Sequence, residues 1–162
     1  MKSLSVMTGP WKNRLILLAA TGCGLGLSPK APGTFGTLAA LPLIWGADFL
    51  PLVTGSFLLI CFILAAVFVA DQAEKILDQK DPGAIVIDEM AGYWVTMCLV
   101  PVNWITLGIG FVAFRCFDIF KCPPVRYFEK KFSGGAGVVL DDIMAGVLAA
   151  LVVKCLYFLG AN

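Results

Sequence analysis

The sequence predicts an all-α fold, a polytopic transmembrane bundle of about five spans preceded by a short N-terminal helix. Of its 162 residues, 59% are hydrophobic and 14% are charged, whereas a soluble protein has roughly 25% charged residues. Residues 31–47, 49–70 and 90–114 contain no charged side chain. Because about 20 mostly apolar residues cross a bilayer, at least three segments are expected in lipid. Residues 1–162 are expected to form one integral-membrane domain.

Hydropathy and helix-breaking residues place the individual helices. We expect spans at residues 31–50, 54–71, 85–100, 104–121 and 138–159, after a short or interfacial helix near 12–24. Pro101 interrupts the long uncharged stretch, and a proline inside a helix removes a hydrogen bond and clashes with the preceding turn. The stretch is therefore expected to form a helical hairpin, with one kinked helix as the alternative.

The basic residues predict the orientation of the bundle, since Lys and Arg accumulate in cytoplasmic loops. They precede the first expected span and follow the second and fourth, whereas the loops near residues 48–55 and 101–104 have none. The set comprises Lys2, Lys12, Arg14, Lys30, Lys75, Lys80, Arg115, Lys121, Arg126, Lys130 and Lys131. The N-terminus is expected inside and, with five spans, the C-terminus outside. Trp45 and Trp104 are then expected at the outer interface.

Composition also excludes several classes of function. The chain has no histidine, which removes histidine-activated nucleophiles and histidine-ligated zinc. A net charge of +1 without a basic stripe gives no indication of nucleic-acid binding. The cysteines are Cys23, Cys61, Cys98, Cys116, Cys122 and Cys155. They lack C-x-x-C spacing, so they predict packing residues and not a zinc site or a disulfide framework.

Two pairs of adjacent acids are expected at the starts of two spans, Asp88-Glu89 and Asp141-Asp142. Residues 88–92 and 142–146 share the pattern D-x-M-A-G, whose glycine permits two helices to approach closely. The helix dipole favours such acids by about 0.3–1 kcal/mol, but an acid in a span costs roughly 2.5–3.5 kcal/mol. Capping alone therefore does not explain the pairs, and hard oxygen ligands of this kind suit Mg²⁺.

Residues 28–37 and 114–126 contain the remaining polar motifs. In the first, two prolines are expected to prevent a regular helix, while Thr34 or Thr37 caps the helix that follows. It is either a turn into the membrane or a phosphate cradle. In the second, Arg115, Asp118 and Lys121 share one helical face. They form either an interfacial salt-bridged face or a phosphate and metal site, and the basic run from Arg126 is expected to meet anionic head groups.

Asp71 and Glu74, at the end of the second span, either add to the acidic cluster or form a solvated helix end.

Four motifs in order resemble those of the phosphatidylglycerophosphatase A family. They are residues 28–37, Ile87-Asp-Glu89, the FRxFDxxK pattern of residues 114–121 and the GGxGVxLDDxxAG pattern of residues 134–146. Cys122 departs slightly from the lysine-proline pairing expected in the family. The resemblance implies a multi-pass Mg²⁺-dependent phosphatase of the bacterial inner membrane that converts phosphatidylglycerophosphate to phosphatidylglycerol at the cytoplasmic face.

The resemblance also implies roles for individual residues. Asp88, Glu89, Asp141 and Asp142 would hold Mg²⁺, with Asp88 and Asp142 also counted as catalytic. Arg115 and Lys121 would balance developing negative charge, and Asp118 would be a further ligand or the general base. Substrate binding is expected from Lys30, Gly33, Thr34, Gly36, Thr37 and Arg126.

Three other classes of membrane protein share features with this sequence. A CDP-alcohol phosphatidyltransferase has an Asp-Gly core motif that is missing here, and the other large class of membrane lipid phosphatases requires histidine. A small cation transporter or ion-binding module remains the alternative, but it would place acids in the middle of several spans. The oligomeric state is not predicted.

Overall fold

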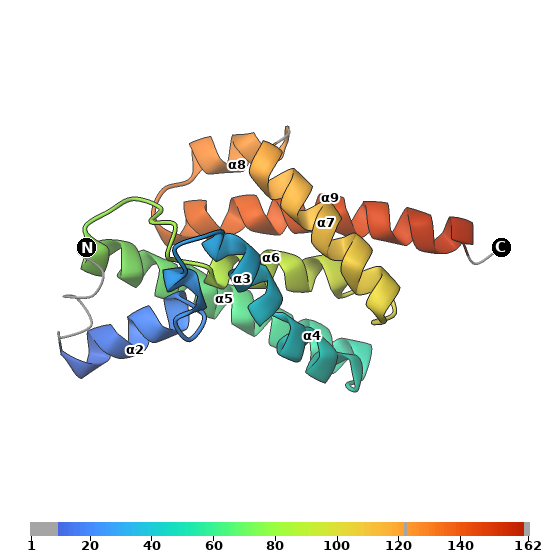
Figure 1. The fold of residues 1–162 in the computed structure, drawn as a ribbon, viewed down its shortest axis with the longest axis horizontal. Helices are drawn as coiled ribbons and strands as arrows, with labels where there is room; N and C mark the ends of the chain where they lie inside the picture. The colour runs from blue at the N-terminus through green and yellow to red at the C-terminus, as the bar shows by residue number, and fades with distance from the viewer. Residues whose placement is uncertain (1–9, 122, 161–162) are drawn as a thin grey trace.

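The computed structural model describes residues 10–121 and 123–160, and every regular element in these ranges is helical (Figure 1). The elements are α2 (Trp11–Ala20), the short 3₁₀ helix η1 (Leu25–Leu27), α3 (Pro32–Ala39), α4 (Leu41–Asp48), α5 (Leu52–Leu77), α6 (Ile87–Met97), α7 (Trp104–Phe120), α8 (Val125–Lys131) and α9 (Gly135–Gly160). The predicted all-α class is confirmed for these residues. Lys2 and Cys122 lie outside them.

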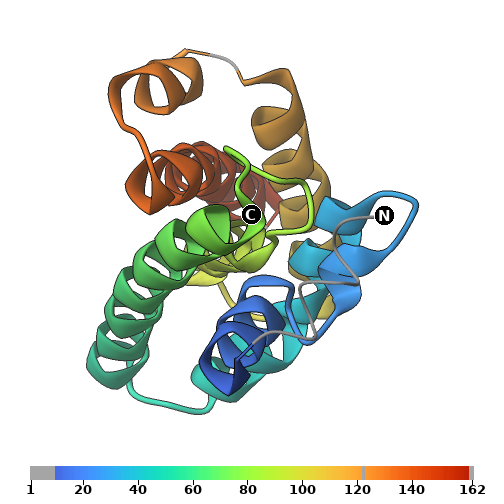
Figure 2. The same ribbon diagram turned by 90° about the vertical axis from the view of Figure 1, so that its left-hand side faces the viewer.

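Helix α6 occupies the centre of the bundle, where it packs against α3, α5, α7 and α9 (Figure 2). Seven consecutive residues, 91–97, are buried, so this part of the helix is enclosed on all sides and lacks a solvent-facing stripe. The Tyr93 hydroxyl joins α6 to α7, because it donates a hydrogen bond to the carbonyl of Leu107 at 2.8 Å. A helix enclosed in this way gives the charged residues at its start a fixed position.

Two helices, α5 and α9, are long and apolar enough to cross a membrane by length and composition. Each has 26 residues and so extends about 39 Å, more than the roughly 30 Å hydrocarbon core. Large apolar side chains on α5 are exposed, among them Phe57 (64%), Leu64 (65%) and Phe68 (62%). An exposed apolar face of this kind is typical of a surface that contacts lipid or another protein.

The remaining predicted spans differ from the helices observed. The span expected at 31–50 is divided into α3 and α4, because Pro42 lies at the start of α4 and cannot continue the preceding helix. The span expected at 85–100 contains only the 11 residues of α6, about 16 Å long. The span expected at 104–121 corresponds to the 17 residues of α7. Five spans therefore remain a prediction.

The hairpin predicted around Pro101 is confirmed. Helix α6 ends at Met97 and α7 begins at Trp104. The Asn103 side chain accepts hydrogen bonds from the N–H groups of Ile105 and Thr106, each at 3.0 Å, and so caps α7. At this end of the bundle Trp104 lies beside Trp45, with ring centroids 5.2 Å apart, as expected if both occupy one interface.

Glycines at the crossing of α6 and α9 bring the two helices into backbone contact. A Cβ atom on Gly146 would collide with the carbonyl of Gly92, and a Cβ on Gly92 would lie 2.6 Å from the carbonyl oxygen of Asp142. The Thr96 hydroxyl lies 3.0 Å from the carbonyl oxygen of Gly92 and 3.4 Å from that of Gly146. The close approach predicted from the shared D-x-M-A-G pattern is therefore confirmed.

Replacing Gly146 by valine is expected to lower the free energy of unfolding by about 1–3 kcal/mol, because the added atoms overpack a rigid backbone contact. Thermal unfolding of purified protein in detergent would measure this loss. Gly108→Ala is the matched control, since nothing lies within 4 Å of a Cβ at this position of α7. Equal loss in both variants would contradict the close packing of α6 on α9.

Candidate functional site

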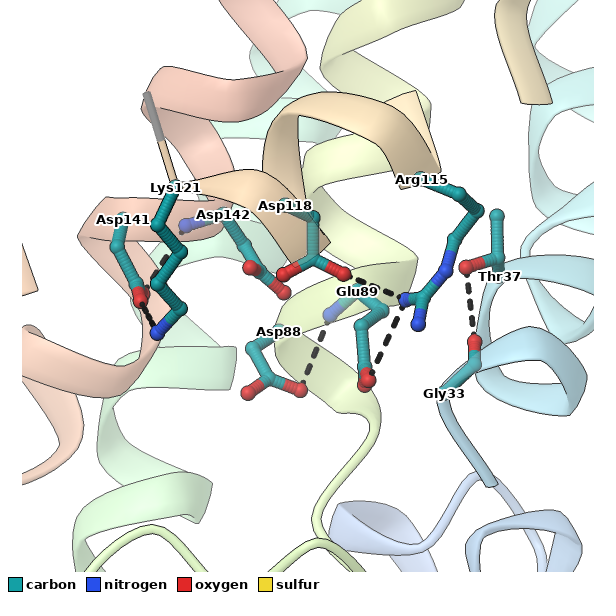
Figure 3. Close-up of polar contacts among 9 residues, drawn as sticks. All are labelled: Gly33, Thr37, Asp88, Glu89, Arg115, Asp118, Lys121, Asp141 and Asp142. Atoms are coloured by element: carbon teal, nitrogen blue, oxygen red, sulfur yellow. Dashed lines mark hydrogen bonds and ion pairs between the residues drawn. The ribbon is translucent and has the colours of Figure 1, made fainter. Parts of the chain in front are cut away.

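Charged residues from four parts of the chain line a cavity of about 270 Å³. They come from the loop before α6, the start of α6, the end of α7 and the first third of α9 (Figure 3). The charged lining residues are Asp81, Asp88, Glu89, Asp118, Lys121, Asp141 and Asp142. The structure thus brings together the acids of both predicted pairs, although more than 50 positions separate them in the sequence.

Three of these acids form a tight group. Asp88, Glu89 and Asp142 each offer a carboxylate oxygen, and these atoms lie within 4.8 Å of one another. Asp88 and Asp142 are only 6% and 5% exposed. Like charges this close repel strongly where water is scarce. A cation bound here would relieve this repulsion, and the donor set, oxygens alone, fits Mg²⁺ or Mn²⁺ and not a nitrogen- or thiolate-seeking metal.

Arg115 supplies positive charge beside this group. Its Nη1 atom lies 2.7 Å from Asp118 Oδ2 and 3.6 Å from Glu89 Oε1, and the side chain is 17% exposed. The contacts are close in distance but poorly directed, because Nη1 and Nε of Arg115 and Oε2 of Glu89 have no hydrogen-bond partner among the described residues. Each such buried atom costs about 1–3 kcal/mol. A bound ligand with acceptor oxygens could satisfy the two nitrogens, and a donor or a cation could satisfy Glu89 Oε2.

Gly33, in the first turn of α3, contacts this part of the site. A Cβ atom here would collide with Glu89 Oε1 and would lie 2.8 Å from Arg115 Nη2. The Thr37 hydroxyl donates to the Gly33 carbonyl at 2.8 Å (Figure 3), and Gly36 packs directly against Val86. The motif of residues 28–37 therefore supports the start of α6 and the Arg115–Glu89 contact.

The expectation that Thr34 or Thr37 caps the helix is wrong. Helix α3 begins at Pro32, with Ala31 as the N-cap residue and no side-chain cap. Proline is favoured in the first turn of a helix, where its missing N–H leaves no bond unmade. Both threonines consequently lie inside α3.

Helix α9 also begins earlier than predicted, at Gly135. Asp141 and Asp142 therefore lie in its second turn, beyond the reach of the helix dipole, which is confined to the first turn. Asp88 and Glu89, in contrast, lie in the first turn of α6. The dipole accounts for part of the stability of the α6 pair and for none of the α9 pair.

At the other side of the cavity Lys121 is paired with Asp141. Lys121 Nζ donates to Asp141 Oδ2 at 2.8 Å, and the other oxygen, Oδ1, accepts the backbone N–H of Asp142 at 3.1 Å. Asp141 is 5% exposed. Of the two adjacent aspartates, only Asp142 belongs to the tight carboxylate group.

Several predicted residues do not line this cavity. The predicted residues absent from its lining are Lys30, Gly33, Thr34, Gly36, Thr37, Arg115 and Arg126. Arg115 and Gly33 contact the lining residue Glu89 from behind, whereas Lys30 and Arg126 are exposed. Asp71 pairs with Lys75 on α5, with Nζ 2.6 Å from Oδ2. Because α5 continues to Leu77, Asp71 lies inside the helix and not at its end, and it belongs to neither the cavity lining nor the carboxylate group.

Sequence reasoning missed Asp81 and Gly83, which line the cavity from the loop before α6. Glu74 Oε1 accepts the backbone N–H of Asp81 at 2.6 Å and so ties this loop to the end of α5. The turn residues Asp81-Pro82-Gly83 immediately before the Ile87-Asp88-Glu89 motif could have indicated that this loop folds over the site.

Comparison with known proteins identifies the family. Residues 18–157 match the family described as phosphatidylglycerophosphatase A. The chain belongs to this family. The phosphatidylglycerophosphatase A of Escherichia coli strain K12 is 41% identical to it over 160 residues, which cover 98% of this chain and 88% of the relative. The Haemophilus influenzae protein of the same name is 35% identical over 148 residues, covering 88% of this chain and 89% of the relative.

A Bacteroides thetaiotaomicron protein with the provisional name phosphatidylinositol-3-phosphatase is 40% identical over 149 residues. The match covers 86% of this chain and 91% of that protein. No solved structure matches the chain significantly. The family was thus predicted correctly from the four motifs.

Gly33→Ala is expected to weaken Mn²⁺ binding by about tenfold, the usual effect of disturbing a residue that supports a metal ligand. Mn²⁺ is a suitable probe because it prefers oxygen ligands, as Mg²⁺ does. The added methyl group meets the ends of Glu89 and Arg115, which can move, so the thermal midpoint should change little. Isothermal titration calorimetry measures the affinity. Gly46→Ala, where a Cβ would occupy open space on α4, is the control. Unchanged Mn²⁺ affinity in Gly33→Ala would show that α3 does not support the site.

Proposed function

We propose that the chain is a Mg²⁺-dependent lipid phosphatase that hydrolyses the terminal phosphomonoester of phosphatidylglycerophosphate to phosphatidylglycerol and phosphate. The observation that carries the proposal is the buried group of Asp88, Glu89 and Asp142 beside the incompletely paired Arg115. This juxtaposition places ligands for a cation in the cavity, with a phosphate donor directly behind the lining residues Glu89 and Asp118. The names of the E. coli and H. influenzae relatives support the choice of substrate.

Asp88, Glu89 and Asp142 would hold the metal. Their oxygen donors and their mutual repulsion fit a divalent cation, and Glu89 Oε2 is buried without a partner among the described residues. When bound, Mg²⁺ would neutralise phosphate charge and make a water molecule a better nucleophile.

The chain's own residues would bind the phosphate and move the proton. Arg115, held by Asp118, would donate to phosphate oxygens and offset the charge that develops on them. Asp118 lines the cavity and would take the proton from the attacking water. The water oxygen bonds to phosphorus and the bond from phosphorus to the glycerol oxygen breaks. The glycerol oxygen takes up the proton that Asp118 removed from the water and becomes the product hydroxyl.

We also propose that the enzyme crosses the bacterial inner membrane several times, as predicted, with the cavity at the cytoplasmic face. Helices α5 and α9 support this proposal by their length and their exposed apolar side chains. The end of α5, the starts of α6 and α9, and the end of α7 lie toward one end of the bundle (Figure 1). The basic loops that predict the cytoplasmic side belong to that end. A phospholipid would therefore present its head group directly to the cavity.

Purified protein in detergent is expected to release phosphate from phosphatidylglycerophosphate only when Mg²⁺ is present. Asp142→Asn and Glu89→Gln should each reduce the rate at least about a hundredfold, because a metal ion contributes several kcal/mol to such a reaction. Lys75→Met, on the exposed side of α5, is the control and should retain the wild-type rate.

The same assay with phosphatidylinositol 3-phosphate tests the substrate suggested by the Bacteroides relative's name. Faster release from this lipid would replace the proposed substrate. No release from either lipid, or activity unaffected by both substitutions, would contradict the mechanism.

The orientation is tested with single cysteines in a variant lacking the native ones. A cysteine at position 131 is expected to react with a membrane-impermeant maleimide only after the cytoplasmic side is opened, because Lys131 belongs to the basic α8. A cysteine at position 53, where Val53 is 82% exposed beside the uncharged loop, should react from outside in intact cells. The reverse labelling pattern would overturn the proposed topology.

A further inference from the structure

The two adjacent aspartates of α9 have different surroundings, although the sequence analysis expected both to hold the metal. Asp142 contributes to the group of three carboxylates within 4.8 Å, together with Asp88 and Glu89. Asp141 contacts other partners through both of its oxygens. Oδ2 accepts from Lys121 Nζ at 2.8 Å, and Oδ1 accepts the Asp142 N–H at 3.1 Å.

The backbone at the end of α7 directs the Lys121 side chain toward Asp141. Lys121 ends α7 with a left-handed backbone (φ 43°), and its N–H donates to the Phe117 carbonyl at 2.9 Å. The side chain leaves the helix toward α9, and both Lys121 and Asp141 line the cavity. Figure 3 shows this pair at one side of the acidic group and Arg115 at the other.

The side chains of Lys121 and Asp141 differ in their exposure to solvent. The Lys121 side chain is 27% exposed, whereas that of Asp141 is 6% exposed. The ammonium is therefore accessible from the cavity, while the carboxylate that holds it is covered. A lysine has a long flexible stem, and fixing it in advance reduces the entropy lost when a ligand binds.

We propose that Asp141 is a positioning residue that holds the Lys121 ammonium at the cavity, and that Lys121 contacts the substrate phosphate from the side opposite Arg115. The metal ligands would then be Asp88, Glu89 and Asp142, without Asp141. This inference rests on the proposed phosphatase function and assigns separate tasks to the two aspartates. A phosphate dianion between two cationic side chains gains charge-assisted hydrogen bonds from both.

Mn²⁺ titration of Asp141→Asn and Asp142→Asn tests the first half of the proposal. Asp142→Asn is expected to weaken Mn²⁺ binding at least about tenfold. Asp141→Asn should leave the affinity close to that of the wild type, because asparagine keeps the oxygen that accepts the Asp142 N–H. Equal loss of Mn²⁺ affinity in both variants would overturn the division of roles.

Binding of inorganic phosphate to the Mn²⁺-loaded protein tests the second half. Lys121→Met should weaken phosphate binding by about tenfold or more, the loss of one charged hydrogen bond. Asp141→Asn should weaken it by about two- to tenfold, the effect of releasing one side chain. The double variant should bind no more weakly than Lys121→Met alone, since Asp141 acts through Lys121.

Lys75→Met is the control for the phosphate measurement. Lys75→Met removes another aspartate-paired lysine, at an exposed site, and should leave phosphate affinity unchanged. Unchanged phosphate affinity in Lys121→Met, or additive losses in the double variant, would overturn the proposal. Because both probes are measured by binding, these effects without lipid hydrolysis would contradict the proposed substrate and leave the roles of the two aspartates standing.

Discussion

The structure depends on the convergence of three carboxylates inside an apolar bundle. Asp88, Glu89 and Asp142 lie close enough to repel one another, and few water molecules can screen them at 5–6% exposure of the two aspartates. Such a group is tolerated only with positive charge nearby. Arg115 provides part of that charge, and the proposed metal would provide the rest. Natural sequences retain costly buried acids mainly where function requires them.

The packing of the helices follows from this requirement. The contact between Gly92 and Gly146 brings α6 and α9 together one turn from the acids, so the carboxylates of both helices reach one cavity. On the other side, Gly33 leaves room for the pair of Glu89 and Arg115. Any side chain at Gly92 or Gly146 would push the two helix backbones apart, whereas a side chain at Gly33 would displace the ends of Glu89 and Arg115. The glycines thus determine how closely the helices approach, and this approach places the carboxylates of α6 and α9 in one group.

The sequence predicted the all-α class, the hairpin at Pro101 and the glycine contact, because each follows from a local rule of helix geometry or helix breaking. It did not predict that α6 is short and enclosed or that Pro42 divides the first expected span, since hydropathy alone cannot distinguish a lipid-facing helix from a buried one. The candidate acids were predicted because placing a carboxylate in an apolar span costs more free energy than the helix dipole returns. Their different surroundings, and the participation of Asp81, depend on how α5, α7 and α9 meet, which no local pattern encodes.

The central claim is that Asp88, Glu89 and Asp142 bind one divalent cation beside a phosphate site. Crystals of the protein grown with Mn²⁺ and inorganic phosphate, measured at a wavelength where manganese scatters anomalously, would test it directly. We predict an anomalous peak bounded by oxygens of these three residues, with phosphate density between it and Arg115. A peak elsewhere in the chain, or none at concentrations that support activity, would contradict the assignment of these residues as metal ligands.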